Sequence, residues 1–555
     1  MAIVTFDKKT FEKEIGKFDE KMENKISMFG TPVESEDSKE IQIEVFPNRP
    51  DLLSYHGFKR SFLSFLGKSP GMKNYSMKKP KSNFKVIVDS SVKNVRPYTS
   101  CAIVKGLKLN DNKIKEIIEV QEKLHLTVGR KRKKLAIGIY PLDKIKLPIT
   151  FKAINQKEIN FVPMGSTESM RGDEIIRKHP TGKEYAHLLK GMDKFPLFVD
   201  AENNVLSMPP IINSEFAGKI TEKTKDVFVE CSGFDAGLLK KCMIILSTML
   251  ADMGGKIYQM EIKSSNFKKE ISPDFKSSEM KISINNVSKL IGLEFDESKV
   301  KTLLEKMGYN YKKNSNSVEI PSWRTDILHE VDLIEDIAIA YGYENLVPEI
   351  PSISTIGSEN PKETMKRKIS EIFSGLGFLE VLNYHLTNKE NQLKKMGEFK
   401  KKLMEIKGSK SEYNLLRRDL SHYLLKNFSE NSDSEYPQKL FEIGRVFDLE
   451  VDNVVEGENL SFGVSAGGFT EVKQTLEYLF KMINLNFKLE EPKETEEVPK
   501  YLVRGRIASV VLDGKSLGYF GEVHPRILRN WKIKMPVAIC EISLKEVFEK
   551  LNQIS

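Results

Sequence analysis

The residues with the clearest capacity for chemistry are four acids in the segment 321–345, PSWRTDILHEVDLIEDIAIAYGYEN. Asp332, Glu335 and Asp336 are spaced at i, i+3 and i+4, so a helix would place their carboxylates on one face, and Asp326 precedes its first turn. We predict that this acidic face lies opposite the buried one. Like charges at this spacing repel by roughly 0.2–0.5 kcal/mol per pair, and no Lys or Arg follows on the same face.

Two interpretations of this acidic face stay open at this point. Most acidic helix faces are simply solvated. A bound cation would instead relieve the repulsion, and oxygen ligands without cysteine, with His329 as the one nearby nitrogen donor, suit Mg²⁺. This ion commonly takes one or two carboxylates directly and holds others through its waters.

The element that must position these acids is an amphipathic helix. Ser322, Thr325 or Asp326 can cap its start, and Gly342 can end it. Its predicted buried stripe recurs at helical spacing and consists of Val331, Ile334, Ile337, Ala338 and Tyr341.

The acidic segment also carries a family resemblance. Its pattern R-T-D-I-x-x-x-V-D-L-I-E-D-I-A-x-x-Y-G-Y is similar to the metal-site domain of the phenylalanyl-tRNA synthetase β-subunit family, in the shorter archaeal and eukaryotic form. The resemblance implies that Asp326, Asp332, Glu335 and Asp336 bind Mg²⁺ near the contact with an α subunit, as an assembly feature. Residues 48–57, N-R-P-D-x-L-S-x-x-G, resemble the same family, although a structural turn and helix would also explain them.

A second group of candidate residues lies in the region 84–262, where Ser, Thr, Asn, Gly and Pro separate short apolar runs. Loops of this kind on a rigid sheet often form pockets. The region resembles the family's editing domain, which hydrolyses Tyr wrongly attached to the tRNA. We name as candidates for that pocket Leu206, Ser207, Pro209, Asn213, Ser214, Thr221, Thr224, Asp226 and Glu230.

The mechanism expected for this pocket is hydrolysis by a positioned water, because no Ser-His-Asp arrangement is legible. A pocket shaped for Phe discriminates only about a hundredfold against a side chain that merely adds a hydroxyl. A second site that hydrolyses the wrong product is therefore useful. The alternative is that Pro209 and Asn213 merely shape a loop.

Tyr140 and Pro141 stand where the family often has His-Asp. The basic run 130–134 is either a solvated loop or a phosphate contact.

The rest of the chain predicts alternating helices and strands. We expect helices over 113–128, 235–254, 298–307 and 365–376, and strands over 281–292 and 317–323. The region 360–555 predicts an antiparallel sheet backed by helices and resembles the catalytic-like domain of the synthetase β subunit, which is related to the class II synthetase core. It lacks the Arg-containing strands that hold ATP, so the expected role is structural pairing with a catalytic α subunit.

The length and composition of the chain limit its number of domains and its class of protein. The chain has 555 residues, 40% of them hydrophobic, which is too long for one core and predicts several domains. The four cysteines are widely separated and indicate neither a zinc site nor disulfides, and no apolar run is long enough to cross a membrane. We therefore expect a cytoplasmic protein with no membrane partner. The net charge of +9 is compatible with an RNA partner without requiring one.

The combined expectation is an α+β multidomain chain. Its predicted domains are an N-terminal α/β domain (1–80), an editing-type and tRNA-contact domain (84–262), a magnesium-site domain (270–347) and a class II synthetase-like domain inactive for adenylation (360–555). The resemblance implies the β subunit of an α₂β₂ phenylalanine–tRNA ligase that binds tRNA(Phe), with ATP as a substrate at the α subunit. The alternatives are a stand-alone aminoacyl-tRNA deacylase and a non-enzymatic RNA-binding scaffold.

Overall fold

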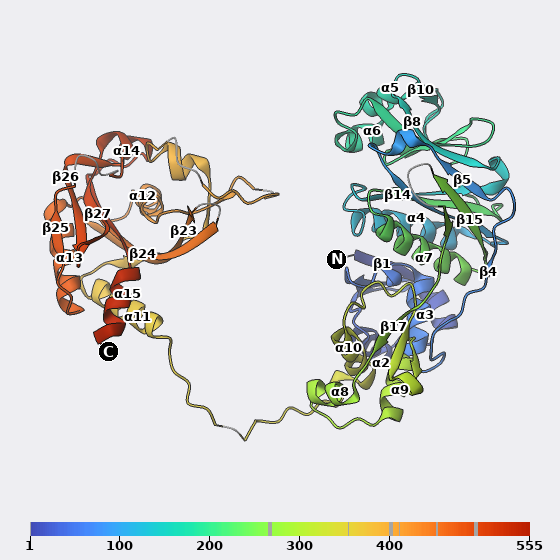
Figure 1. Ribbon diagram of the computed structural model, residues 1–555, viewed down its shortest axis with the longest axis horizontal. Coiled ribbons are helices and arrows are strands. Elements are labelled where there is room, and N and C mark those ends of the chain that lie inside the picture. Colours follow the sequence, from blue (N-terminus) through green and yellow to red (C-terminus); the bar gives the residue numbers. More distant parts are fainter. Residues whose placement is uncertain are drawn as a thin grey trace. The chain divides into compact units, whose positions relative to one another are not determined.

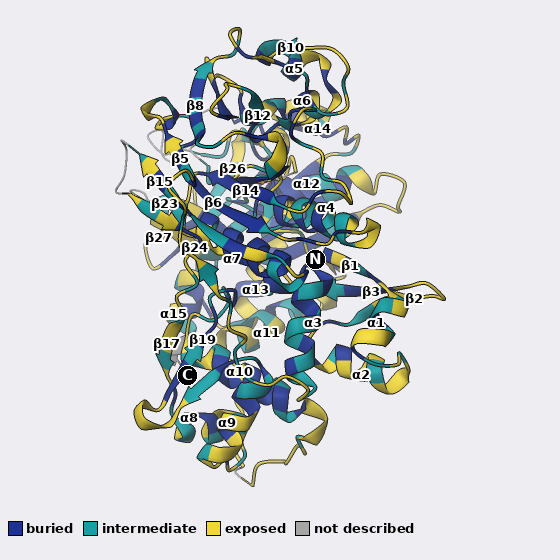
Figure 2. Cartoon of the chain, turned by 90° about the vertical axis from the view of Figure 1, so that its right-hand side faces the viewer, coloured by how far each residue is buried: buried dark blue, intermediate teal, exposed yellow. Residues whose placement is uncertain are grey.

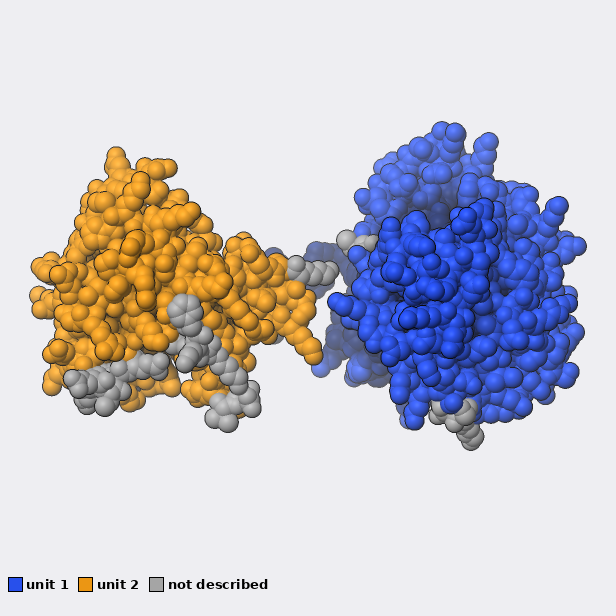
Figure 3. Space-filling model, turned by 90° about the horizontal axis from the view of Figure 1, so that it is seen from above, with its two compact units in different colours: residues 1–350 blue, residues 351–555 orange. Residues whose placement is uncertain are grey.

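The chain forms two compact units, residues 1–350 and 351–555 (Figure 3). The computed structural model describes residues 2–264, 269–352, 354–398, 403–409, 411–450, 453–492 and 498–554. Both units combine helices with sheets, which agrees with the α+β class expected from the sequence.

The first unit begins with a small antiparallel sheet of strand order β1-β3-β2. Its strands are β1 (Ala2–Asp7), β2 (Val33–Glu36) and β3 (Glu40–Val45), and its helices are α1 (Lys8–Glu14), α2 (Glu20–Met28) and α3 (Tyr55–Phe65). Ser54 caps α3 by accepting a hydrogen bond from the Gly57 amide. Phe58 and Phe62 on α3 are fully buried against the sheet, so an aromatic stripe holds the helix in place.

An eleven-strand mixed sheet forms the largest layer of the first unit (Figure 1). Its main path is β13-β12-β11-β8-β5-β15-β6-β14-β7, so β7 is an edge strand, and β4 and β16 pair with β15. The bounds are β4 (Met77–Lys78), β5 (Lys85–Val88), β6 (Tyr98–Lys105), β7 (Leu135–Pro141), β8 (Ile149–Asn155), β11 (Lys194–Val199), β12 (Val205–Met208), β13 (Ile212–Asn213), β14 (Val227–Gly233), β15 (Lys256–Ser264) and β16 (Glu270–Ser272).

Two long helices, α4 (Asp111–Leu126) and α7 (Ala236–Asp252), cover one face of β6, β7 and β14. These helices confirm the predictions over 113–128 and 235–254. Much of α7 is buried (Figure 2), because it lies between the large sheet and the N-terminal helices. Smaller elements cap the far end of the sheet: β9 (Asn160–Phe161), β10 (Met170–Arg171), α5 (Gly172–Lys178) and α6 (Pro180–Tyr185).

The first unit ends with a three-strand antiparallel sheet of order β17-β19-β18 and three helices. The bounds are β17 (Ser278–Lys281), α8 (Ile284–Ile291), α9 (Glu297–Lys306), β18 (Asn310–Lys312), β19 (Ser317–Ile320) and α10 (Glu330–Tyr341). The predicted strand over 281–292 is wrong, because most of it is α8. Ser283 caps α8 by accepting from the Asn286 amide, and Gly292 ends it at φ +81°.

The second unit is built on a seven-strand sheet of order β20-β23-β24-β28-β27-β26-β25. Its strands are antiparallel except for the β20–β23 pair. The bounds are β20 (Leu379–Glu380), β23 (Gln438–Glu450), β24 (Asn453–Ser465), β25 (Lys488–Glu490), β26 (Leu502–Leu512), β27 (Lys515–Val523) and β28 (Val537–Ser543), with a separate pair β21 (Leu386–Thr387) and β22 (Leu415–Leu416).

Helices cover both faces of this sheet. One core contains α11 (Pro361–Gly375), α13 (Phe469–Met482) and α15 (Lys545–Ile554), and the other contains α12 (Ser421–Glu430) and α14 (Pro525–Asn530). All four cysteines of the chain are buried free thiols. Across the described residues, we find no helix with the length and apolar character that a membrane crossing requires.

Candidate functional site

A cavity of about 490 Å³ lies at the open edge of the large sheet, beside β7. We call it the β7-edge pocket. Apolar side chains of α4, β7 and β13 line much of it, and Ser207, Asn213 and Glu230 add a polar wall from β12, β13 and β14. A mostly apolar cavity with a few converging polar groups is the usual form of a small-molecule site.

The polar wall is organised by the phenol of Tyr140. Its hydroxyl lies 2.8 Å from Ser207 Oγ, 3.1 Å from Glu230 Oε1 and 3.5 Å from Asn213 Oδ1. Gly138 makes room for this cluster, because a Cβ there would lie 2.0 Å from the Tyr140 hydroxyl. Four strands, β7, β12, β13 and β14, thus bring four polar groups to one point of a buried surface.

Glu230 is the unusual member of this cluster. Burial raises the pKa of its carboxyl to about 8, although hydrogen bonds from Tyr140 and Ser232 and the charge of Arg96 oppose that rise. Its Oε2 atom is buried and has no hydrogen-bond partner among the described residues. The side chain is therefore a neutral acid at pH 7, with one oxygen available to a bound molecule.

This burial predicts a pH-dependent stability. The unfolded Glu230 ionises near about 4.3 and the folded one near about 8, so the folded state retains a proton that the unfolded state loses. The stability that this group contributes is complete below the unfolded pKa and declines by about 1.4 kcal/mol per pH unit until the folded pKa is passed. Glu230→Gln should therefore gain in melting temperature relative to wild type between pH 5 and pH 8 in calorimetry.

Glu122 gives the matched control for this experiment. Its hydrogen bond with His125, together with the charge of Arg132, outweighs burial and lowers the pKa of Glu122 to about 2. Both its folded and unfolded forms are then ionised from pH 5 to pH 8, so Glu122→Gln should change the melting temperature by a constant amount. Parallel pH profiles for Glu230→Gln and wild type would contradict the buried neutral acid.

The predicted editing residues divide into two groups. Ser207, Pro209, Asn213 and Glu230 line the β7-edge pocket. The others have different positions: Leu206 is fully buried in the core behind β12, Ser214 Oγ accepts from the Ala217 amide, Thr224 is buried and accepts from the Thr221 amide, and Asp226 accepts from the Gly106 amide and pairs with Lys105.

Sequence reasoning missed three residues that shape the pocket: His125, Arg132 and Tyr140. His125 Nε2 accepts a hydrogen bond from the Ile137 amide at 2.8 Å, so that nitrogen is not available as a base. Arg132 donates to the Ile211 carbonyl at 2.9 Å and pairs with Glu122 at 2.9 Å. The sequence shows that Tyr140 stands where the family often has a different residue, but it does not predict the contacts that Tyr140 makes.

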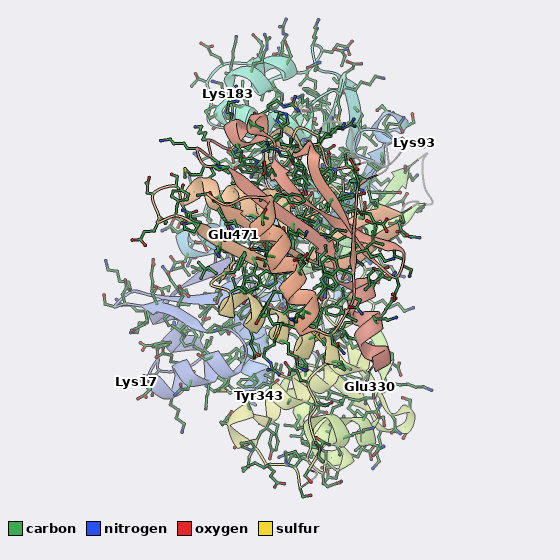
Figure 4. All side chains as sticks on the ribbon, turned by 90° about the vertical axis from the view of Figure 1, so that its left-hand side faces the viewer. Lys17, Lys93, Lys183, Glu330, Tyr343 and Glu471 are labelled. Atoms are coloured by element: carbon green, nitrogen blue, oxygen red, sulfur yellow. The ribbon has the colours of Figure 1, made fainter. Side chains whose placement is uncertain are left out.

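The acidic segment has a different geometry from the one predicted. Helix α10 begins at Glu330 with His329 as its cap, and Figure 4 labels Glu330 at its start and Tyr343 just beyond its end. Ser322, Thr325 and Asp326 lie before the helix in the loop and do not cap it. Gly342 ends the helix as predicted.

The prediction that the acidic face lies wholly opposite the core is wrong, because Asp336 is buried. The guanidinium of Arg324 relieves the repulsion between the carboxylates. Arg324 reaches Asp336 Oδ2 at 2.7 Å and Asp326 Oδ2 at 2.7 Å, and the Tyr309 hydroxyl also donates to Asp336. Val331, assigned to the buried stripe, is 49% exposed, and Leu333 is buried. The relieving charge comes from the preceding loop, which helical spacing could not reveal.

The two segments with the family resemblance meet in this charge network. Arg49 pairs with Asp51 through two hydrogen bonds of 2.9 Å, and its charge also acts on Asp326 and Arg324. Burial would raise the pKa of Asp326, but the hydrogen bonds and charge of Arg324, together with Arg49, hold it below its ordinary value. The N-terminal motif therefore helps to balance the acids that precede α10.

The remaining oxygens of the acidic quartet fit a hard cation. Asp332 Oδ2 accepts from the amides of Leu328 and His329, whereas its Oδ1, the Oδ1 of Asp336 and both oxygens of Glu335 accept no hydrogen bond from described residues. Burial and the charges of Asp336, Asp332 and Asp326 raise the pKa of Glu335, so the other three carboxylates act on it electrostatically. No three His, Cys, Asp or Glu side chains of the described residues are already gathered as a metal-binding group.

Comparison with known proteins gives consistent matches along the chain. Residues 280–343 match the tRNA synthetase B5 domain, and residues 346–544 match the phenylalanyl-tRNA synthetase beta chain CLM domain. The phenylalanine–tRNA ligase beta subunit of Pyrococcus horikoshii is 38% identical over 509 residues, which are 90% of each chain. That of Archaeoglobus fulgidus is 36% identical over 560 residues, 99% of each chain.

A solved structure also resembles the chain. It is the crystal structure of an N-terminal fragment of the phenylalanyl-tRNA synthetase beta subunit from Pyrococcus horikoshii, with a TM-score of 0.59 and 38% sequence identity. The match covers 62% of this chain and 100% of that fragment.

Proposed function

Because this chain belongs to the family of phenylalanine–tRNA ligase β subunits, we propose a division of labour within the ligase. The ligase attaches phenylalanine to tRNA(Phe) with ATP, and the chain acts as its β subunit. In our proposal this subunit hydrolyses Tyr-tRNA(Phe), contacts the tRNA and holds the assembly together. ATP is then a substrate at the α subunit, and the complex works in the cytoplasm as an α₂β₂ tetramer.

The observation that carries the hydrolytic role is the polar wall of the β7-edge pocket. Phenylalanine and tyrosine differ by one hydroxyl. Tyr140 gathers Ser207, Asn213 and Oε1 of Glu230, and the buried Oε2 of Glu230 has no hydrogen-bond partner among the described residues. A site built to hydrogen-bond a substrate hydroxyl rejects the analogue that lacks it by about 10⁴–10⁵-fold, since its polar groups would stay unpaired. Such a pocket admits the tyrosyl ester and excludes the phenylalanyl ester.

The expected chemistry is attack of a positioned water on the ester carbonyl. Among the described residues no base activates Ser207: His125 Nε2 already accepts from a backbone amide, and Ser207 Oγ accepts from the Tyr140 hydroxyl. The water adds to the carbonyl carbon, its proton passes to the departing ribose oxygen through the solvent, and free tyrosine leaves. The role of the chain's own residues is to orient the ester and admit the water.

Asn213→Ala tests this assignment. It removes a polar group from the wall, so we expect hydrolysis of preformed Tyr-tRNA(Phe) by the complex to fall about tenfold to a hundredfold, with Phe charging unchanged. The control Asn83→Ala changes an exposed amide outside the pocket. Equal deacylation by wild type and Asn213→Ala would remove the β7-edge pocket from consideration.

We further propose that Mg²⁺ binds Asp326, Asp332, Glu335 and Asp336. The oxygens that accept no hydrogen bond from the described part of the chain belong to Asp332, Glu335 and Asp336, and Arg324 holds Asp326 and Asp336 in place. The ion would supply positive charge where the acids crowd. Its role is to brace the assembly with the α subunit, since these acids lie outside the β7-edge pocket.

The second unit is proposed to be the class II synthetase-like partner of the α subunit. Its sheet is largely antiparallel, and the exposed apolar residues Leu379, Leu382 and Tyr384 follow α11 at the β20 edge. Arg417 is not available to a nucleotide, because it is buried against Glu442. The unit therefore offers an assembly surface without an arginine free to hold ATP at that position.

One purification tests the whole proposal. The chain is expressed with and without its α partner, and both samples are assayed for Phe charging and Tyr-tRNA(Phe) hydrolysis. Charging by the complex together with hydrolysis supports the proposal. Hydrolysis with no partner binding would indicate a stand-alone deacylase, and neither activity would indicate a non-enzymatic RNA-binding scaffold.

A further inference from the structure

The basic run 130–134 forms a tight turn between α4 and β7. Three consecutive residues, Arg130, Lys131 and Arg132, have φ values of 47°, 54° and 62°. Side chains of L-residues rarely allow this left-handed conformation, least of all in sequence. The turn is held by hydrogen bonds from the Arg132 amide to the His125 carbonyl (3.1 Å) and from the Lys134 amide to the Gly129 carbonyl (2.9 Å).

This turn separates the five basic side chains into two sets. Arg132 points inward, where it pairs with Glu122 and its guanidinium lies 4.5 Å from the Tyr185 ring centre. The remaining side chains are exposed and form no ion pair with any described residue; they are Arg130, Lys131, Lys133 and Lys134. A constrained backbone therefore presents unpaired positive charge at a fixed place.

A second cavity, of about 480 Å³, lies beside this turn. We call it the basic cavity. Lys133, Lys134, His187, Arg96 and the ring of Phe234 line it, and Asp235 is its one acidic lining residue among those described. Asp235 accepts from the Leu238 amide as the cap of α7. The lining thus carries more positive charge, from Arg96, Lys133 and Lys134, than negative charge.

Arg96 forms the floor of the basic cavity. It is 2% exposed, and its Nε and Nη2 atoms donate to the hydroxyl and the carbonyl of Ser232 at 3.1 and 2.6 Å. Its Nη1 donates to no described residue, so the two N–H groups of this atom remain for a ligand. The guanidinium lies 5.4 Å from the Phe234 ring centre.

Phe234 supplies a flat apolar surface beside these charges. The residue is 50% exposed. Gly233 allows the close approach that places it there, because a Cβ at this position would lie 2.3 Å from the Lys134 carbonyl oxygen. An exposed aromatic ring beside unpaired cations is the combination that binds single-stranded nucleic acid.

The basic cavity adjoins the β7-edge pocket. Pro210 lines both cavities, and Ser232, which holds Arg96, also lowers the pKa of Glu230. Residues 230 and 232 lie on the same face of β14, since side chains alternate along a strand. A ligand that extends out of the β7-edge pocket past Pro210 enters the basic cavity.

We propose that the basic cavity binds the unpaired RNA nucleotides that immediately precede the aminoacylated nucleotide in the β7-edge pocket. One base stacks on Phe234, and Lys133, Lys134 and the free Nη1 of Arg96 contact the backbone phosphates. The proposal rests on the hydrolytic function proposed above. It names an RNA strand as the occupant because the unpaired cations complement its phosphates and the ring complements its bases.

The first test compares two substrates that differ only in this RNA. The full complex, as wild type and as Lys133→Ala/Lys134→Ala/Phe234→Ala, is assayed with Tyr-tRNA(Phe) and with tyrosyl-adenosine, which lacks the preceding nucleotides. We expect the variant's KM for Tyr-tRNA(Phe) to rise about tenfold, with kcat and tyrosyl-adenosine hydrolysis unchanged. Lys157→Ala/Lys223→Ala removes the same lysine charge from exposed positions outside both cavities and should behave as wild type.

The second test does not require hydrolysis. Equilibrium binding of a fluorescent single-stranded RNA ending in CCA is measured by anisotropy, and we expect the triple variant to bind about tenfold more weakly than wild type and the lysine control. Unchanged RNA affinity, or equal losses with both substrates, would overturn the RNA subsite. Weakened binding in a chain that hydrolyses neither substrate would keep the subsite and overturn the proposed hydrolytic function.

Discussion

Replacing Arg324 with methionine is expected to lower the free energy of unfolding of the first unit by about 3–5 kcal/mol when no divalent cation is present. Arg324 is 6% exposed and lies 2.7 Å from both Asp326 and Asp336. The substitution leaves these carboxylates without their counter-charge, and the Tyr309 hydroxyl remains as a neutral partner of Asp336. Urea titration in EDTA, followed by Trp323 fluorescence in a Trp531→Phe background, measures the loss.

Magnesium should restore part of that loss if the quartet binds it. A ligand that binds only the folded state adds stability according to its concentration over its dissociation constant. Millimolar Mg²⁺ should therefore stabilise Arg324→Met more than wild type. Arg60→Met is the matched control, because it removes an arginine whose side chain is 7% exposed and pairs with the single acid Asp252 at 2.6 Å. It should be destabilised without any rescue by Mg²⁺.

The metal proposal fails if Mg²⁺ leaves Arg324→Met unchanged or rescues Arg60→Met equally well. Asp332→Ala approaches the same question from the other side, since it keeps Arg324 and removes a metal oxygen. It should lose the response to Mg²⁺ or weaken binding of the α subunit before Tyr-tRNA(Phe) hydrolysis changes. Loss of hydrolysis with metal and assembly intact would make the quartet part of the catalytic machinery instead.

The second large loss of stability is expected in the second unit, residues 351–555, where Arg417 and Glu442 form an ion pair. These side chains are 2% and 1% exposed and lie 2.5 Å apart, and Arg417 Nε also donates to the Arg445 carbonyl at 2.8 Å. Gly444 leaves space for the guanidinium, since a Cβ there would lie 2.3 Å from its Nη2. Arg417→Met strands a buried carboxylate and should cost about 3–5 kcal/mol of unfolding free energy.

Tryptophan fluorescence can isolate this effect, because the chain has two tryptophans and each unit contains one. Urea unfolding of a Trp323→Phe background reports the second unit through Trp531. The double variant Arg417→Met/Glu442→Leu should recover much of the loss, since it removes both charges. Arg445→Met breaks an exposed pair with Glu456 and should cost less than about 1 kcal/mol. A similar cost for Arg417→Met would refute the buried-pair argument.

The sequence correctly predicted helices whose signals all lie within one short stretch of the chain. Helices at 113–128, 235–254 and 298–307 are confirmed as α4, α7 and α9, because the apolar spacing lies within each segment. Each helix also has a capping residue at its start, which is Asn110, Asp235 or Asp296. The strand expected over 281–292 was wrong, because its short apolar run fits either structure and the Ser283 cap with Gly292 favours a helix. Short runs of this kind are ambiguous to periodicity alone.

Residues of the candidate site could be predicted from the sequence only where several of them lie in one strand segment. Within V-L-S-M-P-P, alternation places Ser207 toward the β7-edge pocket and Leu206 in the core, a distinction that requires knowing which face is buried. His125 lines the pocket from α4 and Tyr140 contacts Ser207 from β7, and no sequence spacing relates either residue to Ser207. Arg324 similarly lies outside the helix whose acids it neutralises, so helical spacing concealed it.

The burial of every native thiol has a practical consequence for spectroscopy. Burial raises the pKa of Cys101 and of Cys540 above the ordinary value, so these sulfurs are both shielded from reagents and poorly ionised. A cysteine introduced at one exposed position in each unit would then react with maleimide dyes ahead of the native ones. Energy transfer between the two dyes would measure, molecule by molecule, how the separation of the units changes when tRNA is added.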